Sequence, residues 1–251
     1  MTAPKTSSSR ITARKRRALA YAVHGLTASG AVLGFLALTA AVQGDAQTAF
    51  LWLGAALLID GVDGPLARWI GVKDATPNVD GAALDNVVDF LTYVVAPAAI
   101  VWAGGIVPPG WEIAASGLVT AAGAWTFANA DMKTHDWWFA GFPAVWNVVV
   151  FGLWGMGAGG WTALAVIAGC AALTFTRVKF VHPIRVRAFR PATLAATAAW
   201  AAASAALLAF PESAMAGAAR WLWGVSAGWF GALTIWRSFG PGREAPAEGS
   251  A

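Results

Sequence analysis

Eight apolar stretches divide this chain, and they constrain its fold more than any other feature of the sequence. Their approximate ranges are 18–43, 47–62, 83–107, 112–130, 142–158, 161–178, 192–210 and 219–237. A helix needs about 20 apolar residues to cross the hydrocarbon core of a bilayer, and about 17 can suffice. We therefore predict an all-α fold, a polytopic membrane bundle of about eight transmembrane helices that forms one domain over 18–238.

The composition agrees with a bilayer as the solvent. Hydrophobic residues make up 58% of the 251 residues, and charged residues make up 12%, which is about half the usual share in a soluble protein. The single cysteine, Cys170, allows no internal disulfide and no multi-thiolate metal site, so we interpret it as a packing residue. These properties exclude a soluble domain, a disordered chain and a disulfide scaffold.

The basic residues fall almost entirely on one predicted side of the membrane. Sixteen of the 17 lie in the segment 1–17, in the connections after the second, fourth and sixth apolar stretches, or near the C-terminus, and Arg220 is the exception. Lys and Arg near helix ends concentrate in the cytoplasm. We therefore expect both termini in the cytoplasm, a basic N-terminal tail over 1–17 and a disordered tail over 239–251. Anionic lipid is the expected partner of these charges, rather than nucleic acid.

Four aspartates lie near the cytoplasmic ends of the second and third predicted helices. Asp60 and Asp63 share one helix face at i and i+3, and Asp85 and Asp89 share another at i and i+4. Placing an acidic side chain at membrane depth costs roughly 2.5–3.5 kcal/mol, so such residues are functional candidates. Two antiparallel neighbours would direct all four carboxylates at one place.

Carboxylate oxygens without His or Cys favour a hard cation, Mg²⁺ or Mn²⁺, over zinc. Two divalent cations would balance the formal charge of the four aspartates. Gly64, Ala67 and Gly81 lie on the same helix faces and leave room for a diphosphate or a planar base. Divalent metals beside a diphosphate indicate phosphoryl transfer.

The spacing of these residues resembles the signature of the CDP-alcohol phosphotransferases, integral membrane enzymes of phospholipid synthesis. The pattern is Asp60-x2-Asp63-Gly64-x2-Ala67-Arg68, then Gly81-x3-Asp85-x3-Asp89. Twelve residues, 69–80, separate its two halves, where most members of the family have eight. This gap, together with the stretches 141–147 and 179–187, is similar to the bacterial branch of the family that uses choline.

The resemblance implies a phosphatidyl transfer from CDP-diacylglycerol to choline that releases CMP, at the cytoplasmic face of a bacterial inner membrane. It implies that the four aspartates hold two metal ions, Mn²⁺ or Mg²⁺, and that Asp89 is also the general base. It also implies that four residues line the CDP pocket: Gly64, Ala67, Arg68 and Gly81. A homodimer is a further implication of the resemblance.

The loop after the sixth apolar stretch supplies our candidates for the substrate's lipid phosphate, which are Arg185, Arg187 and Lys179. Choline has no N–H donor on its quaternary nitrogen, so its recognition should use aromatic faces. Tyr93, one turn past Asp89, has a suitable position. The other candidates for the choline pocket are Trp146 and Asn147.

Three alternatives remain open at this point. An enzyme that uses another alcohol, such as glycerol phosphate, inositol phosphate or serine, would keep the metal site. A cation transporter would use the same carboxylates as an ion path, but it should carry acidic residues near mid-membrane in several helices. A catalytically inactive scaffold is disfavoured because every position of the motif is intact.

Overall fold

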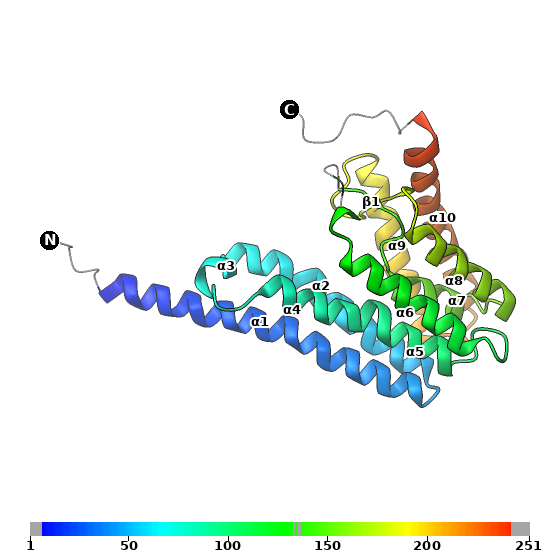
Figure 1. Ribbon diagram of the computed structural model, residues 1–251, viewed down its shortest axis with the longest axis horizontal. Helices are drawn as coiled ribbons and strands as arrows, with labels where there is room; N and C mark the ends of the chain where they lie inside the picture. Colours follow the sequence, from blue (N-terminus) through cyan, green and yellow to red (C-terminus); the bar gives the residue numbers. More distant parts are fainter. Residues whose placement is uncertain (1–6, 133, 135–136, 242–251) are drawn as a thin grey trace.

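The computed structural model describes residues 7–132, 134 and 137–241, with side chains from residue 12 onward, and confirms the all-α fold (Figure 1). Its α-helices, in chain order, are α1 (Ser7–Val42), α2 (Ala46–Ile70), α3 (Val72–Ala75), α4 (Gly81–Asp89), α5 (Ala96–Ala103), α6 (Glu112–Ala128), α7 (Trp146–Gly155), α8 (Gly160–Thr174), α9 (Arg190–Ala209) and α10 (Ala216–Phe239). A π-helical turn η1 (Phe90–Val95) joins α4 to α5, and a 3-10 turn η2 (Ala130–Met132) follows α6. Two short strands, β1 (Phe139–Ala140) and β2 (Lys179–Phe180), pair antiparallel.

Each of the eight predicted apolar stretches overlaps a helix of the structure. Among the residues that the structure describes, four helical segments are long and apolar enough to cross a membrane: Thr12–Val42, Ala46–Ile70, Gly81–Ala103 and Arg190–Ala209. The helices α7 and α8 are apolar but shorter. The chain is therefore a membrane protein, and the count of eight spans stays a prediction.

One predicted boundary differs from the structure, and one helix extends beyond its apolar stretch. The helix α1 begins at Ser7, so most of the basic stretch 1–17 is the first part of this helix rather than a separate tail. The helix α2 continues to Ile70, well past the end of its apolar stretch, and so the first half of the aspartate motif is helical throughout. The predicted disorder beyond residue 241 lies outside the described residues.

Close packing of α1 against the third apolar segment depends on a pair of glycines four residues apart. A Cβ added at Gly30 would lie 2.7 Å from Val88 Cγ1, and one added at Gly34 would lie 2.8 Å from Leu91 Cδ2. Small residues at this spacing let transmembrane helices approach closely, because no hydrophobic driving force holds helices together in lipid. The glycine pair therefore brings α1 to the helices that carry the acidic residues.

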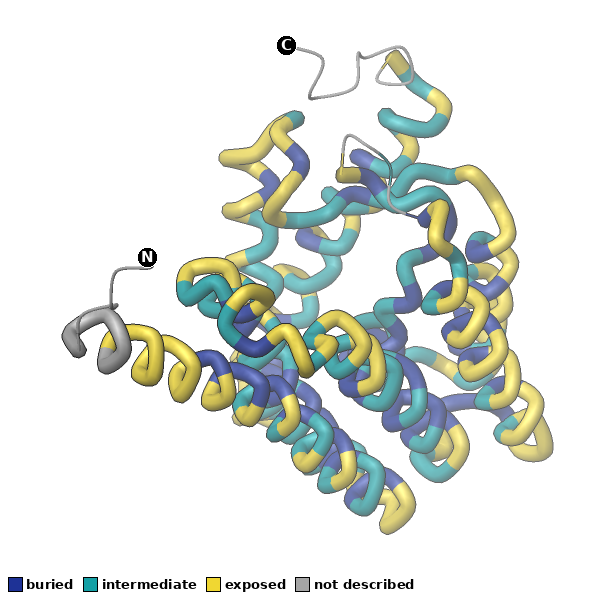
Figure 2. The backbone as a smooth tube through the Cα atoms, turned by 60° about the vertical axis from the view of Figure 1, so that its left-hand side comes forward, coloured by how far each residue is buried: buried dark blue, intermediate teal, exposed yellow. Residues whose placement is uncertain are grey.

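The main core lies between α1, α2, the α4–η1–α5 segment and the helices α6–α8. A smaller cluster of Trp138, Val181, Val186 and Leu233 packs β2 and the following loop against α10. The helices α9 and α10 pack mainly on each other and stand at a steep angle to α1 and α2 in Figure 1. Many residues of both helices are exposed, and Figure 2 colours the backbone by the burial of each residue.

Candidate active site

Three of the four predicted aspartates come together, one from α2 and two from α4. Asp60 of α2 and Asp85 and Asp89 of α4 each place a carboxylate oxygen within 4.8 Å of the other two, and all three residues are half-buried. The start of α4 is fixed by Asp80, whose Oδ1 accepts hydrogen bonds from the Ala82 and Ala83 backbone N–H groups, each at 3.0 Å. The i, i+4 spacing then directs Asp85 and Asp89 to the same face, as predicted.

The fourth aspartate, Asp63, lies outside that group of three. Its side chain is 5% exposed, and its Oδ2 accepts a 2.6 Å hydrogen bond from the Thr27 hydroxyl of α1. Thr27 is itself buried and also lies 3.3 Å from the Val23 carbonyl. A hydroxyl has one proton to donate, and the shorter bond to a carboxylate is the stronger of the two. The helix α1 therefore fixes the orientation of Asp63.

Tyr93 lies at the edge of the acidic group and is bonded to it. Its hydroxyl donates a 2.8 Å hydrogen bond to Asp60 Oδ2. The residue sits in the π-helical turn η1, a form of helix that is frequent at functional sites. The hydroxyl of this residue, whose ring is predicted for the choline pocket, is thus a donor to one of the three clustered carboxylates.

The two other residues predicted for the choline pocket lie at the start of α7. Trp146 is fully buried, stacks edge-on against Phe142 at 4.9 Å, and its indole N–H has no hydrogen-bond partner among the described residues. Asn147 is buried as well, and its Oδ1 accepts from the Val148 backbone N–H at 2.9 Å. The helix α7 packs against η1, which holds Tyr93.

The four residues predicted to line a CDP pocket lie on the same two helices as the acidic group. Arg68 Nη1 lies 3.4 Å from the position that a Cβ would take at Gly64, so the guanidinium extends back along α2 toward the acidic residues. Ala67 packs partly buried against a small cluster with α1. Gly81 is the first residue of α4.

The chemistry of the donor atoms fits a hard divalent cation. Three carboxylates that converge within 4.8 Å offer oxygen ligands from two helices, and the buried carboxylate of Asp63 lies one turn along α2 from Asp60. Mg²⁺ and Mn²⁺ take such oxygen ligands. The acidic group can therefore bind a metal ion.

Known proteins with similar sequences decide the family. The chain is 42% identical over 222 residues to the phosphatidylcholine synthase of Pseudomonas aeruginosa, a match that covers 88% of this chain and 93% of that relative. It is 43% identical over 183 residues to the phosphatidylcholine synthases of Rhizobium johnstonii and Agrobacterium fabrum, with 73% of this chain and 76% of each relative covered. The chain belongs to the phosphatidylcholine synthase family. No protein-family model matches it.

Membership of the phosphatidylcholine synthase family confirms the resemblance predicted from the aspartate pattern. It also confirms the prediction that the chain is an enzyme.

The twelve-residue gap between the two halves of the aspartate pattern has a defined structure in this member. Gly71 ends α2 in a left-handed conformation, with φ of 69°, and the short helix α3 follows. Arg16 of α1 donates from Nε to the Ile70 carbonyl at 2.8 Å and from Nη2 to the Gly71 carbonyl at 3.0 Å. The segment between the two halves of the motif is thus held by α1.

Sequence reasoning missed the buried histidine of this family member. His24 Nε2 lies 3.0 Å from Thr76 Oγ1, and the Thr76 hydroxyl donates to the Val72 carbonyl at 3.1 Å. This contact joins α1 to the residue that follows α3. The imidazole packs on Gly81, where an added Cβ would lie 3.1 Å from its Cε1. His24 and Thr27 are polar residues in an apolar helix, and this property could have marked both as candidates.

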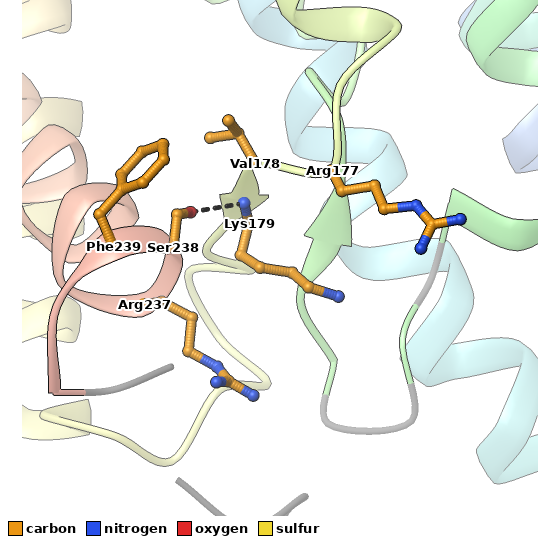
Figure 3. A pocket seen from close by; sticks show the side chains of 6 residues that line it. All are labelled: Arg177, Val178, Lys179, Arg237, Ser238 and Phe239. Carbon is orange, nitrogen blue, oxygen red and sulfur yellow. Dashed lines mark hydrogen bonds between the residues drawn. The ribbon is translucent and has the colours of Figure 1, made fainter. Parts of the chain in front are cut away.

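The structure separates the three cationic residues predicted for the lipid phosphate. Arg185 is exposed and stacks over the Trp137 ring, with its Cζ 4.7 Å from the ring centroid. Arg187 is exposed on the same loop. Lys179 instead belongs to β2 and lines a cavity beside the end of α10 (Figure 3).

Proposed function

We propose that this chain is a phosphatidylcholine synthase, which transfers the phosphatidyl group of CDP-diacylglycerol to choline and releases CMP. The convergence of Asp60, Asp85 and Asp89 is the observation that supports this function most directly. It supplies a site of high negative charge beside small residues, in a chain whose curated relatives are named phosphatidylcholine synthases. Such a site suits a reaction on a diphosphate with bound metal ions.

The proposal assigns two divalent cations, Mn²⁺ or Mg²⁺, to Asp60, Asp63, Asp85 and Asp89. When bound, the cations would supply charge neutralisation for the diphosphate and for the leaving CMP. Asp63 supports a second position because its carboxylate is buried beside the group of three and is oriented by Thr27.

The remaining residues of the motif have roles in binding and proton transfer. Arg68, the only permanent cation of the motif, neutralises a phosphate of CDP, while Gly64, Ala67 and Gly81 leave space for the nucleotide. Asp89 accepts the proton of the choline hydroxyl as the oxygen attacks the lipid-side phosphorus in line with the departing CMP. The atoms balance, since CMP leaves with the electron pair of the broken P–O bond.

The lipid and choline contacts complete the proposal. Arg185 and Arg187 contact the substrate's phosphates from the loop before α9, and Tyr93, with Trp146 and Asn147, contributes to the choline pocket. The chain lies in the bacterial inner membrane with the acidic site and both termini in the cytoplasm, as a homodimer. This orientation rests on the one-sided distribution of the basic residues.

The test is turnover of CDP-diacylglycerol by the purified chain with Mn²⁺ or Mg²⁺, across choline, glycerol 3-phosphate, inositol phosphate and serine. We expect release of CMP and formation of phosphatidylcholine with choline alone. Activity with a different alcohol would keep the metal site but reject the acceptor. Inactivity with all four, combined with divalent-ion flux in proteoliposomes, would replace the enzyme with a transporter.

A further inference from the structure

The short turn between α3 and α4 determines where Gly81 lies, because Gly81 is the residue that follows it. Thr76 comes directly after α3 and is fully buried. Its backbone carbonyl accepts a 3.1 Å hydrogen bond from the Val79 backbone N–H, and Asp80 then caps the first turn of α4. Any displacement of Thr76 is therefore passed through this turn to the first residue of α4.

The imidazole of His24 contacts both ends of this turn. Its Nε2 lies 3.0 Å from Thr76 Oγ1, and a Cβ added at Gly81 would lie 3.1 Å from its Cε1. The His24 residue is only 9% exposed. A single rigid ring of α1 therefore sets the distance between α1 and the start of α4.

A second polar contact between α1 and this turn is open to water. Tyr21 Oη lies 3.2 Å from Asn78 Nδ2, but both residues are exposed, so water can replace this hydrogen bond. His24 and Thr76 are both buried, and a hydrogen bond lost between buried groups is costly because water does not replace it. The buried contact is therefore the one that we expect to hold the turn.

The part of α4 that carries the clustered aspartates has a separate support on α1. Val88 of α4 packs on Gly30, and Leu91 of η1 packs on Gly34. Neither contact involves His24. The loss of the His24 contact should therefore displace the first turn of α4 more than it displaces the carboxylates.

We propose that His24 is a positioning residue for the nucleotide half of the active site. It acts through Thr76 and Gly81, and it holds the start of α4 at the distance from α1 that leaves space for CDP. This inference rests on the proposed function, which assigns Gly81 to the CDP pocket. The affinity for the nucleotide then depends on His24, whereas the affinity for the metal ion does not.

Calorimetric titration of the full chain in detergent with CMP, at saturating Mn²⁺, tests the proposal. His24→Phe keeps a ring beside Gly81 but removes the contact with Thr76. It should raise the Kd for CMP about fivefold, the effect of one lost buried hydrogen bond. Thr76→Val should raise this Kd about as much, and the double variant should raise it no further, because both substitutions remove the same contact.

Steady-state kinetics separate this role from a merely structural one. In His24→Phe, the KM for CDP-diacylglycerol should rise about fivefold, while kcat stays within about twofold and the KM for choline is unchanged. A merely structural loss would lower the fraction of active protein, and with it kcat, at an unchanged KM. Ser29→Ala is the matched control on α1, since the Ser29 hydroxyl bonds the Leu26 carbonyl of its own helix at 2.6 Å, and it should leave all these constants unchanged.

The outcomes distinguish this inference from the proposed function. A wild-type chain that neither binds CMP nor releases it from CDP-diacylglycerol would refute the proposed function itself. A wild-type chain that binds CMP, together with an unchanged Kd in His24→Phe, would overturn only the role of His24. Two further results would also overturn that role: a parallel loss of Mn²⁺ affinity in His24→Phe, and effects of His24→Phe and Thr76→Val that simply add in the double variant.

Discussion

The helices around the acidic group and the α9–α10 pair both lie in a membrane protein, but they satisfy their polar side chains in different ways. Near the acidic group, hydrogen bonds join side chains of different segments: Thr27 to Asp63, Tyr93 to Asp60, and His24 to Thr76. Each of these bonds fixes one element relative to another. Two of the carboxylates, those of Asp60 and Asp63, are therefore oriented by side chains of other segments.

In the α9–α10 pair, most hydroxyls bond a carbonyl one turn earlier in their own helix. Thr197 donates to the Thr193 carbonyl at 2.7 Å, and Ser226 donates to the Leu222 carbonyl at 2.8 Å. Trp200 Nε1 and Ser204 Oγ are buried without a hydrogen-bond partner among the described residues. Such local bonds satisfy a hydroxyl in lipid without specifying a neighbour. The pair also has a bond between its two helices, from Trp229 Nε1 to Thr193 Oγ1 at 3.2 Å, but no carboxylate takes part in it. The difference is therefore that bonds between segments hold acidic side chains only in the first region.

The largest expected effect is the loss of the proposed general base. Asp89→Asn should lower turnover of CDP-diacylglycerol with choline by about 100-fold to 10,000-fold, because an amide cannot accept the choline proton. Radiolabelled CMP release measures it. Glu212→Gln, in the connection between α9 and α10, removes an exposed acid outside the first region and should leave turnover near wild type. Near-native turnover of Asp89→Asn would remove the proposed role of this residue.

A pair of threonines tests the comparison directly. Thr27→Val removes the hydroxyl that orients Asp63, and it should weaken Mn²⁺ binding about 10-fold to 100-fold, as the loss of a group that orients a metal ligand does. Thr197→Val removes a hydroxyl that bonds only its own helix in the structure, and it should leave Mn²⁺ affinity unchanged.

Electron paramagnetic resonance of free Mn²⁺ during titration of the purified protein measures this affinity without turnover. Thr27→Ser keeps the donor and should restore binding. If Thr27→Val and Thr197→Val behave alike, the hydrogen bond between α1 and Asp63 has no part in metal binding.

Helix geometry explains why the acidic residues could be predicted. Asp85 and Asp89 must share a face at a spacing of four, and their cost in lipid marks them as functional. Thr27 and His24 could not be placed in the same way, because the rotation of α1 about its axis is decided by tertiary packing, including the contacts of Gly30 and Gly34 with α4 and η1. The glycine pair can be recognised in the sequence, but the segment against which it packs cannot.

The helix α2 outlasts its apolar stretch. Hydropathy falls after residue 62, but the helix continues through Gly64 and Ala67, as the helix face assigned to them requires, and ends at Ile70, where Arg16 of α1 binds the carbonyls. The π-helical turn at Phe90–Val95 also depends on neighbours: an added Cβ at Gly34 would contact Leu91, and one at Gly123 would contact Val94. Local spacing therefore predicts faces, while tertiary contacts decide where elements end.

Two variants of Tyr93 separate its proposed contact with choline from its hydrogen bond to Asp60. Tyr93→Ala should raise the KM for choline about fivefold, which corresponds to the loss of a cation–π contact worth ~1 kcal/mol. Tyr93→Phe keeps the ring and should keep this KM, but it removes the donor to Asp60 and should weaken Mn²⁺ binding. Steady-state kinetics at saturating Mn²⁺ and the Mn²⁺ titration measure the two effects. An unchanged KM for choline in Tyr93→Ala would exclude the ring from the choline pocket.

The smallest expected effects come from two arginines that each cap the C-terminal end of a helix. Arg16 holds the end of α2 in the first region, and Arg220 donates from Nε to the Gly155 carbonyl at the end of α7, at 2.9 Å. Arg220→Gln should lower the free energy of unfolding by about 1 kcal/mol and leave kinetics unchanged. Arg16→Gln should lower the free energy of unfolding by a similar amount, since the side chain of Arg16 is about half exposed. It should also raise the KM for CDP-diacylglycerol, because α3 and the start of α4 follow the turn that Arg16 caps. Thermal unfolding in detergent and steady-state kinetics measure the two. If Arg220→Gln raised that KM as much as Arg16→Gln, the organisation ascribed to the first region would extend through the whole bundle.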